Sequence, residues 1–174
     1  MAAGFGKIHV ITGAGKGKTT AAFGMALRAV GHGYRVCIVQ FLKTGDTTGE
    51  VLAARRVGIE VRQFGTGRFV DPAHPSEEDR RLAAEAMSYA RGQLDRRACD
   101  MLILDEVNMA LSLGLIERSQ LEDIIRCRGS GVELVLTGRN ADRSIIDLAD
   151  YVSVIENVKH PLDGGLAARK GIEW

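Results

Sequence analysis

The sequence is poor in cysteine, proline and aromatic residues. Its 174 residues include three Cys, three Pro and one Trp, and aromatic side chains make up 5%. Cys37, Cys99 and Cys127 lie beside or inside apolar runs, so we expect buried free thiols and no disulfide framework or metal site. An excess of one charge is also lacking, since 23 Lys and Arg face 22 Asp and Glu. The net charge of +1 argues against a nucleic-acid-binding surface.

Long apolar segments are missing as well. No apolar run approaches the ~20 residues of a membrane-spanning helix. The first residues, Met1-Ala2-Ala3-Gly4, do not have the pattern of a signal peptide, so we expect a cytoplasmic protein. The length suits a single domain over residues 1–174. Glycine, by contrast, is frequent at 21 residues, which predicts tight turns and close approach of the backbone to a ligand.

Short β-rich runs alternate with helical patterns along the chain. We expect strands near 8–11, 36–39, 59–64, 101–104, 132–136 and 151–158, and helices near 18–30, 50–57, 76–95, 115–125 and 142–148. This alternation, with near-continuously apolar strands, predicts an α/β fold with a mostly parallel sheet and helices on both faces. Ligands of such sheets bind at the carboxyl ends of the strands.

A glycine-rich loop follows the first expected strand and opens the first helix. Its backbone N–H groups and the helix N-terminus favour the binding of phosphate. The alternative is a glycine-rich strand-to-helix turn that binds no ligand. Lys18 should reach the phosphates, and the Thr19 hydroxyl should ligate Mg²⁺. The loop is one residue shorter than the common G-x-x-x-x-G-K-[ST] pattern when counted from Gly13. The predicted ATP-binding residues of this loop are Gly13, Ala14, Gly15, Lys16, Gly17, Lys18, Thr19 and Thr20.

Two carboxylates, Asp105 and Glu106, end the most apolar strand. Mg²⁺ usually takes one or two carboxylates together with phosphate oxygens, so this pair predicts metal ligation. Two alternatives stay open: Glu106 could orient an attacking water, and one of the carboxylates, such as Asp105, could cap the following helix.

Two arginines and one histidine are weaker candidates. Arg139 follows another strand and should project to the same edge of the sheet. Arg28 lies on the first helix and is equally well explained as a surface ion pair. His160, before Pro161, is the one histidine whose position leaves a functional role open. No Ser/His/Asp or Cys/His set indicates a nucleophilic hydrolase.

Together these motifs resemble the ATP:corrinoid adenosyltransferases of cobalamin synthesis, also called cob(I)yrinic acid a,c-diamide adenosyltransferases. The resemblance covers nearly the whole chain, and the short loop is itself a feature of that family. The matching segments are residues 13–24, 28–33, 39–43, 104–106, 136–139 and 159–174, of which the last ends at Trp174.

The resemblance implies a RecA-like P-loop fold, a homodimer, and transfer of the 5′-deoxyadenosyl group of ATP to Co(I) of cobalamin or a precursor, with release of triphosphate. It assigns magnesium ligation to Thr19 and Glu106, and nucleotide contacts to Arg28 and Arg139. With the charge of Lys18 beside the leaving triphosphate, Lys18 and Glu106 are the predicted catalytic residues. The resemblance also implies a reductant that supplies Co(I), for which a flavoprotein is a candidate. Neither nucleic acid nor a membrane is expected as a partner.

Residues 65–75 form a glycine- and proline-bearing loop at the family's corrinoid-facing position. Arg68 and Phe69 could lie against a planar ligand, although a plain connector is the simpler interpretation. The family carries a Phe and a Trp after Gly-Thr-Gly, whereas this chain has Phe69 one place later and no Trp; Ala14 also replaces a common Asn. Two other functions remain open: a P-loop ATPase or kinase with Glu106 as base, and a nucleotide-sensing binding module.

Overall fold

The structure is a computed structural model that describes residues 6–45, 47–161, 165 and 167–172. The N-terminal segment Met1-Ala2-Ala3-Gly4 and the family residue Trp174 lie outside the described residues. No helix in the described part of the chain is long and apolar enough to cross a membrane.

One six-stranded sheet organises the described residues, in the order β3-β2-β4-β5-β1-β6. Every neighbouring pair is parallel. The predicted α/β fold with a parallel sheet is therefore confirmed. The strands are β1 (Ile8–Thr12), β2 (Val36–Phe41), β3 (Glu60–Phe64), β4 (Met101–Asp105), β5 (Glu133–Thr137) and β6 (Tyr151–Val154).

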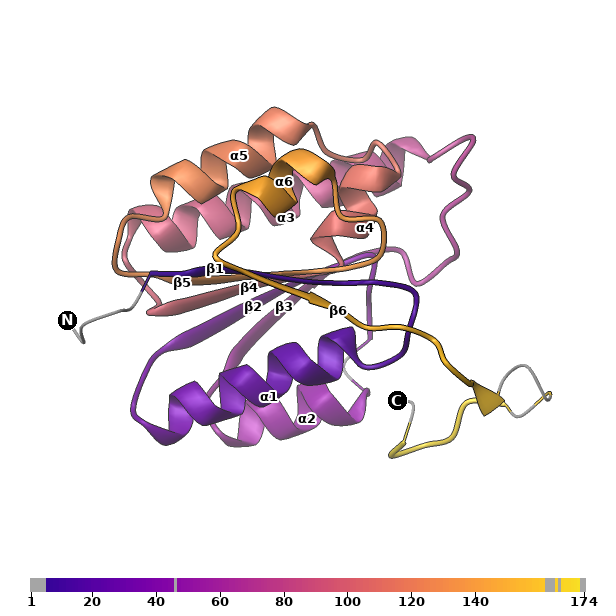
Figure 1. Ribbon diagram of the computed structural model, residues 1–174, viewed down its shortest axis with the longest axis horizontal. Helices are drawn as coiled ribbons and strands as arrows, with labels where there is room; N and C mark the ends of the chain where they lie inside the picture. Colours follow the sequence, from indigo (N-terminus) through magenta and orange to yellow (C-terminus); the bar gives the residue numbers. More distant parts are fainter. Residues whose placement is uncertain (1–5, 46, 162–164, 166, 173–174) are drawn as a thin grey trace.

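Helices cover both faces of this sheet, as predicted (Figure 1). On one face α1 and α2 pack over a core that includes Ile38 and Ile103; on the other, α3 to α6 pack over a core that includes Leu102 and Leu134. The helices are α1 (Lys18–Gly31), α2 (Gly49–Arg56), α3 (Glu77–Asp95), α4 (Val107–Ser112), α5 (Arg118–Cys127) and α6 (Arg143–Asp147).

Local sequence explains several of these boundaries. Ser76 caps α3 as expected: its Oγ accepts a hydrogen bond from the Asp79 N–H at 3.1 Å, and Asp79 accepts one from the Ser76 N–H at 3.2 Å. The cysteines are free, and Cys37 and Cys99 are buried. Burial raises the pKa of the Cys37 thiol to about 12, so it stays protonated and unreactive at neutral pH.

The last strand is shorter than the expected 151–158, because the chain leaves the sheet after Val154 to contact the phosphate loop. The Ile155 N–H donates to the Thr12 carbonyl at 2.8 Å, and the Ile155 carbonyl accepts from the Gly15 N–H at 2.7 Å. The segment after β6 therefore supports the loop that follows β1.

The strand order brings the functional segments to one edge. Since β5 lies between β1 and β4, and β2 borders β4, the carboxyl ends of these strands stand side by side. The glycine-rich loop, Asp105-Glu106 and Thr137-Gly138-Arg139 all follow these ends. This edge is where a parallel α/β sheet places its ligand.

Candidate active site

The glycine-rich loop needs glycine at three of its positions. Gly13 and Gly17 have φ of +102° and +117°, in the region that other L-residues rarely adopt. Gly15 is required for a different reason: the segment after β6 packs against it, and a Cβ there would lie only 2.5 Å from the Glu156 carbonyl oxygen. The loop shape is therefore fixed both by backbone conformation and by the segment after β6.

Lys18, the first residue of α1, lies across the inside of this loop. Its side chain is buried, and its Nζ donates to the carbonyl oxygens of Gly13 at 2.8 Å and Gly15 at 2.7 Å. Burial lowers the pKa of the Lys18 ammonium, and Arg139 adds to this effect, while the carboxylates of Glu106 and Asp105 oppose it. These contacts hold the ammonium at the place where the loop would bind phosphate.

Asp105 is the fully buried centre of a hydrogen-bond network. Oδ1 accepts from the hydroxyls of Thr19 at 2.9 Å and Thr137 at 2.7 Å, and Oδ2 accepts from Gln40 Nε2 at 2.9 Å and Lys43 Nζ at 2.8 Å. Burial alone would raise the pKa of Asp105, but the Lys43 charge and these hydrogen bonds place it below its ordinary value. Asp105 is therefore an ionised carboxylate. It does not cap the next helix, because the residue at the N-cap of α4 is Glu106.

Glu106 has a left-handed backbone, with φ +64°, at the turn into α4. Its N–H donates to Thr137 Oγ1 at 2.9 Å, so the turn is tied to the end of β5. Burial and the neighbouring Asp105 charge raise the pKa of the Glu106 carboxyl above its ordinary value, against the lowering effect of Lys43, Lys18 and Arg139. A cation beside Glu106 would therefore be favourable.

Sequence reasoning missed two members of this network, Lys43 and Gln40. Lys43 donates to Thr19 Oγ1 at 3.0 Å as well as to Asp105. It is aimed there by Leu42, whose φ of +63° turns the chain sharply after β2. Gln40 was detectable in principle, because a single amide inside the apolar run of β2 must find a hydrogen-bond partner when buried.

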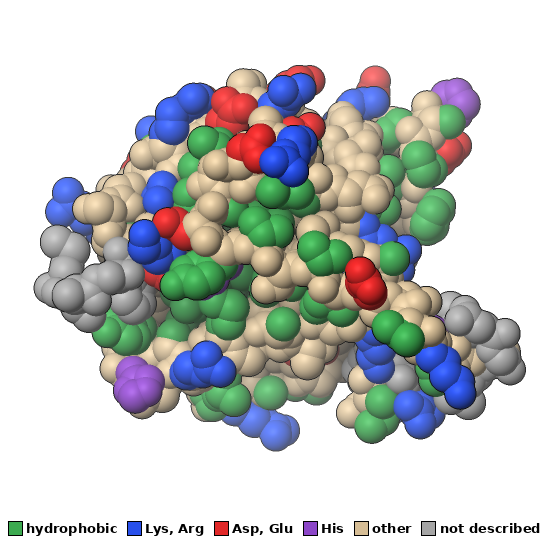
Figure 2. All heavy atoms as spheres, in the orientation of Figure 1, with side chains coloured by type: hydrophobic (Ala, Val, Ile, Leu, Met, Phe, Trp, Pro, Cys, Tyr) green, Lys and Arg blue, Asp and Glu red, His purple; other side chains and the backbone are tan. Residues whose placement is uncertain are grey.

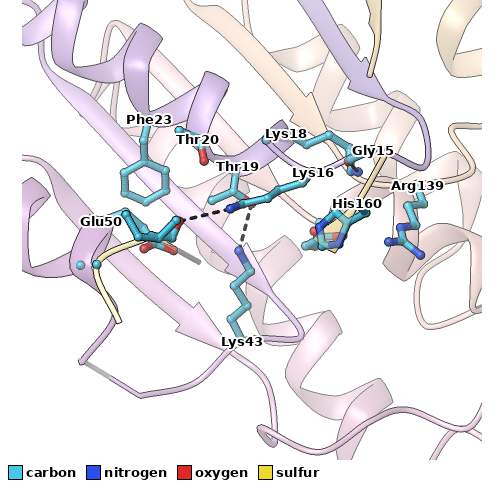
Figure 3. Close-up of a pocket in the computed structure, with 15 residues that line it drawn as sticks. Gly15, Lys16, Lys18, Thr19, Thr20, Phe23, Lys43, Glu50, Arg139 and His160 are labelled. Carbon is cyan, nitrogen blue, oxygen red and sulfur yellow. Dashed lines mark hydrogen bonds between the residues drawn. The ribbon is translucent and has the colours of Figure 1, made fainter. Parts of the chain in front are cut away.

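A cavity of about 560 Å³ opens over the loop and the ends of β1, β2, β4 and β5. In the view of Figure 3, Phe23 and Glu50 lie on one side of Thr19, and His160 and Arg139 on the other. The lining combines four Lys or Arg side chains with two carboxylates, which suits a polyanion. The described lining residues are Gly15, Lys16, Gly17, Lys18, Thr19, Thr20, Phe23, Lys43, Gly49, Glu50, Glu106, Arg139, His160, Gly171 and Ile172.

Within this chain the structure does not bring Arg28 to the cavity. Arg28 lines a separate, smaller cavity of about 200 Å³ with Tyr34 and Met101, near the amino ends of β2 and β4. The reason is helix geometry, since ten residues of α1 span about 15 Å. Arg139, by contrast, does line the cavity over the loop, and so does His160.

The loop of residues 65–75 leaves its candidate aromatic side chain in solvent. Phe69 is 89% exposed and Arg68 is also exposed, and neither lines the cavity. Figure 2 shows hydrophobic side chains projecting on this loop, at the upper right. The loop is nevertheless anchored, because Val70 is buried and Thr66 Oγ1 donates to Asp79 Oδ1 at 3.2 Å. Since the loop follows β3, it stands at the same edge of the sheet as the cavity.

The oxygen atoms beside the loop fit a magnesium ion. Thr19 offers a hydroxyl, Glu106 and Asp105 offer carboxylates, and the Lys43 ammonium already sits as a cation against Thr19 and Asp105. The described residues contain no group of three or more His, Cys, Asp or Glu that could hold a metal alone. A Mg²⁺ ion held by Thr19 and a carboxylate would take its remaining ligands from phosphate and water.

Comparison with known proteins decides the family. Residues 5–174 match the family described as ATP:corrinoid adenosyltransferase BtuR/CobO/CobP. The chain belongs to this family. It is 37% identical over 169 residues to the corrinoid adenosyltransferase of Escherichia coli K12 and to the corrinoid adenosyltransferase CobA of Salmonella typhimurium, covering 97% of this chain and 86% of each relative.

A third corrinoid adenosyltransferase, from Pseudomonas aeruginosa, is 36% identical over 170 residues, with 97% of this chain and 84% of that relative covered. The predicted family, enzyme class and P-loop fold are thereby confirmed. The description of the family names ATP and a corrinoid, and these are therefore the two substrate classes. The roles of individual residues are taken up below.

Proposed function

We propose that this chain transfers the 5′-deoxyadenosyl group of ATP to Co(I) of cobalamin or a corrinoid precursor. The observation that supports this most directly is the cationic cavity over a short phosphate loop in a chain of this family. In the reaction, cobalt attacks C5′ and forms the cobalt–carbon bond, while the C5′–oxygen bond breaks and its electron pair leaves with triphosphate.

The chain's part in this reaction is alignment and charge stabilisation. Co(I) is a strong nucleophile, so no protein base is needed. The loop N–H groups and Lys18 face the triphosphate on which negative charge grows, and Arg139 lines the same cavity. Thr19 and Glu106 would hold Mg²⁺, which supplies further positive charge beside the phosphates when bound. Ala14, Gly15, Lys16, Gly17 and Thr20 complete the proposed ATP-binding loop.

Several further assignments belong to this proposal. A homodimer would allow a partner subunit to contribute to the nucleotide site, which is the remaining route by which Arg28 could act there. A flavoprotein could supply the electrons that make Co(I). We also propose that residues 1–174 act as one domain in the cytoplasm.

Incubation with chemically reduced cobalamin and ATP tests the function. We expect a light-sensitive absorbance change, which reports a cobalt–carbon bond, together with an equal amount of triphosphate. Phosphate and ADP without that change would indicate a P-loop hydrolase, and no product with intact ATP binding would indicate a nucleotide-sensing module.

Glu106→Gln tests the metal role of the carboxylate. The substitution keeps the shape of the side chain but removes its charge, so the Mg²⁺ concentration needed for half-maximal transfer should rise about 10-fold or more. Activity at saturating Mg²⁺ should largely recover. Loss of a phosphate-releasing activity that saturating Mg²⁺ does not restore would favour the hydrolase, in which Glu106 acts as base.

Phe69→Ala tests the corrinoid-facing loop. An exposed aromatic side chain that covers the lower face of the corrinoid would make Co(II) easier to reduce. The variant should therefore lose more activity with Co(II) corrinoid plus reductant than with prereduced Co(I). Equal losses in the two assays would indicate a general binding role, and no loss in either would make residues 65–75 a plain connector.

A further inference from the structure

The cation beside the phosphate loop in this structure is a side chain. Lys43 Nζ lies 2.8 Å from Asp105 Oδ2 and 3.0 Å from Thr19 Oγ1. Asp105 is fully buried, and the other donors around it are neutral: two hydroxyls and the Gln40 amide. Lys43 therefore supplies the positive charge in direct contact with a carboxylate that water cannot reach.

Thr19 is the residue that the ammonium shares with the proposed metal site. Its hydroxyl donates its one proton to Asp105 Oδ1, and the oxygen accepts from Lys43. A divalent cation on that oxygen would stand next to the Lys43 ammonium, and the two positive charges would repel each other. Metal ligation at Thr19 therefore requires that Lys43 move away.

The cavity offers a favourable place for the displaced ammonium when it holds a polyanion. Its described lining has three other positive side chains, Lys16, Lys18 and Arg139, against the carboxylates of Glu50 and Glu106. Without nucleotide, an ammonium that leaves Asp105 would face these cations. With a triphosphate present, the phosphate oxygens become the new partners of the Lys43 ammonium. The metal then replaces Lys43 as the cation that balances the negative charge of Asp105.

We propose that Lys43 is a tethered cation that occupies the Thr19–Asp105 position in the absence of nucleotide and exchanges with the divalent metal when ATP binds. This inference rests on the proposed magnesium site. It means that metal and nucleotide bind as a unit, because the exchange leaves every charge paired. Metal without nucleotide is therefore expected to bind only weakly.

The backbone around Lys43 connects this exchange to the loop of residues 65–75. A Cβ on Gly65 would lie 2.3 Å from the carbonyl carbon of Leu42 and 2.4 Å from the N atom of Lys43, and one on Gly67 would lie 2.6 Å from Thr44 Cγ2. The start of that loop therefore packs directly on the Leu42–Lys43 turn. If nucleotide binding moves the backbone at Lys43, Gly65 is the residue of that loop that lies directly against it.

Mn²⁺ binding to the full chain, followed by the loss of the free-ion paramagnetic resonance signal, tests the exchange without any corrinoid. Wild type should bind Mn²⁺ weakly alone and about 10- to 100-fold more tightly with ATP, after subtraction of the Mn²⁺ that the same ATP concentration binds without protein. Lys43→Gln should bind Mn²⁺ alone more tightly than wild type by a similar factor, and Mg²⁺ should displace it. Lys43→Arg, which keeps the charge, should show no gain.

Lys7→Gln is the matched control, because Lys7 makes an ion pair of the same length, 2.8 Å, with Asp150 on the surface. It should behave as wild type. Tight Mn²⁺ binding by wild type without ATP would overturn the proposal, even if Lys43→Gln failed to fold. Equal affinity of wild type and folded Lys43→Gln would overturn it too.

The outcome is separable from that of the proposed function. A chain that shows this Mn²⁺ pattern but forms no cobalt–carbon bond would retain the exchange and lose the transferase function. A chain that transfers the adenosyl group but binds Mn²⁺ tightly without nucleotide would lose the exchange alone.

Discussion

Lys18→Ala is expected to abolish adenosyl transfer while leaving the protein folded. The Lys18 ammonium contacts only the carbonyl oxygens of Gly13 and Gly15 among the hydrogen bonds of the described structure, and it faces the cavity. Removing a charge aimed at a leaving triphosphate should lower the rate by about 100-fold or more. The measurement is triphosphate release with prereduced cobalamin, alongside a thermal melt.

Lys7→Ala provides the comparison for this variant, because Lys7 is a partly exposed lysine in a surface ion pair with Asp150. It should retain near-normal transfer. The proposed role of Lys18 would be wrong if Lys18→Ala melted cooperatively and still released triphosphate at a near-normal rate. A loss of the cooperative melt would instead assign Lys18 to the stability of the loop.

Asp105→Ala is expected to destabilise the protein more than removal of a surface carboxylate. The change removes the shared acceptor of the partly exposed Lys43 ammonium, of the Thr19 hydroxyl and of the buried Thr137 hydroxyl. Removing one partner of such a pair costs about 3 kcal/mol. For a chain of this length the melting temperature should fall by about 6 to 12 °C.

Asp147→Ala is the control, because Asp147 makes an exposed ion pair with Arg143 at 2.9 Å. That change should alter stability by no more than about 0.5 kcal/mol. Asp105→Asn, which keeps the size and one acceptor oxygen, should lie between the two. A melting temperature of Asp105→Ala within the range of the control would show that the network around Asp105 does not stabilise the fold.

The sequence predicted all six strands of the described structure and most helices because their signals are local, but it did not predict the short helix α4 (Val107–Ser112). Apolar runs with β-branched residues marked the strands, and Ser76 with Asp79 marked the start of α3. The main error in strand length was at β6, where alternation continues beyond Val154 but Ile155 hydrogen-bonds to Thr12 and Gly15. That error arose because the partner of Ile155 is more than a hundred residues away in the chain.

The site residues also fall into two groups, those predicted by local motifs and those placed by the tertiary structure. The loop of residues 13–20 and the Asp105-Glu106 pair could each be predicted from a few neighbouring residues, and their roles stay predictions. Arg28 matched a family arginine, yet helix geometry places it at the other edge of the sheet. Lys43 and Gln40 lie in a segment that matches the family, but the sequence assigned them no role, and the pairing of β2 with β4 placed them beside Asp105.

By itself, the sequence determined the family, the phosphate loop and the α/β character of this protein, because each depends on residue types at short, fixed spacing. The tertiary structure decided which charges meet. Asp105 is held as a buried, ionised carboxylate because Thr19, Thr137 and the Gln40–Lys43 stretch converge on it from three different segments. Convergence of that kind depends on strand order and register, which the spacing of residues along the chain does not contain.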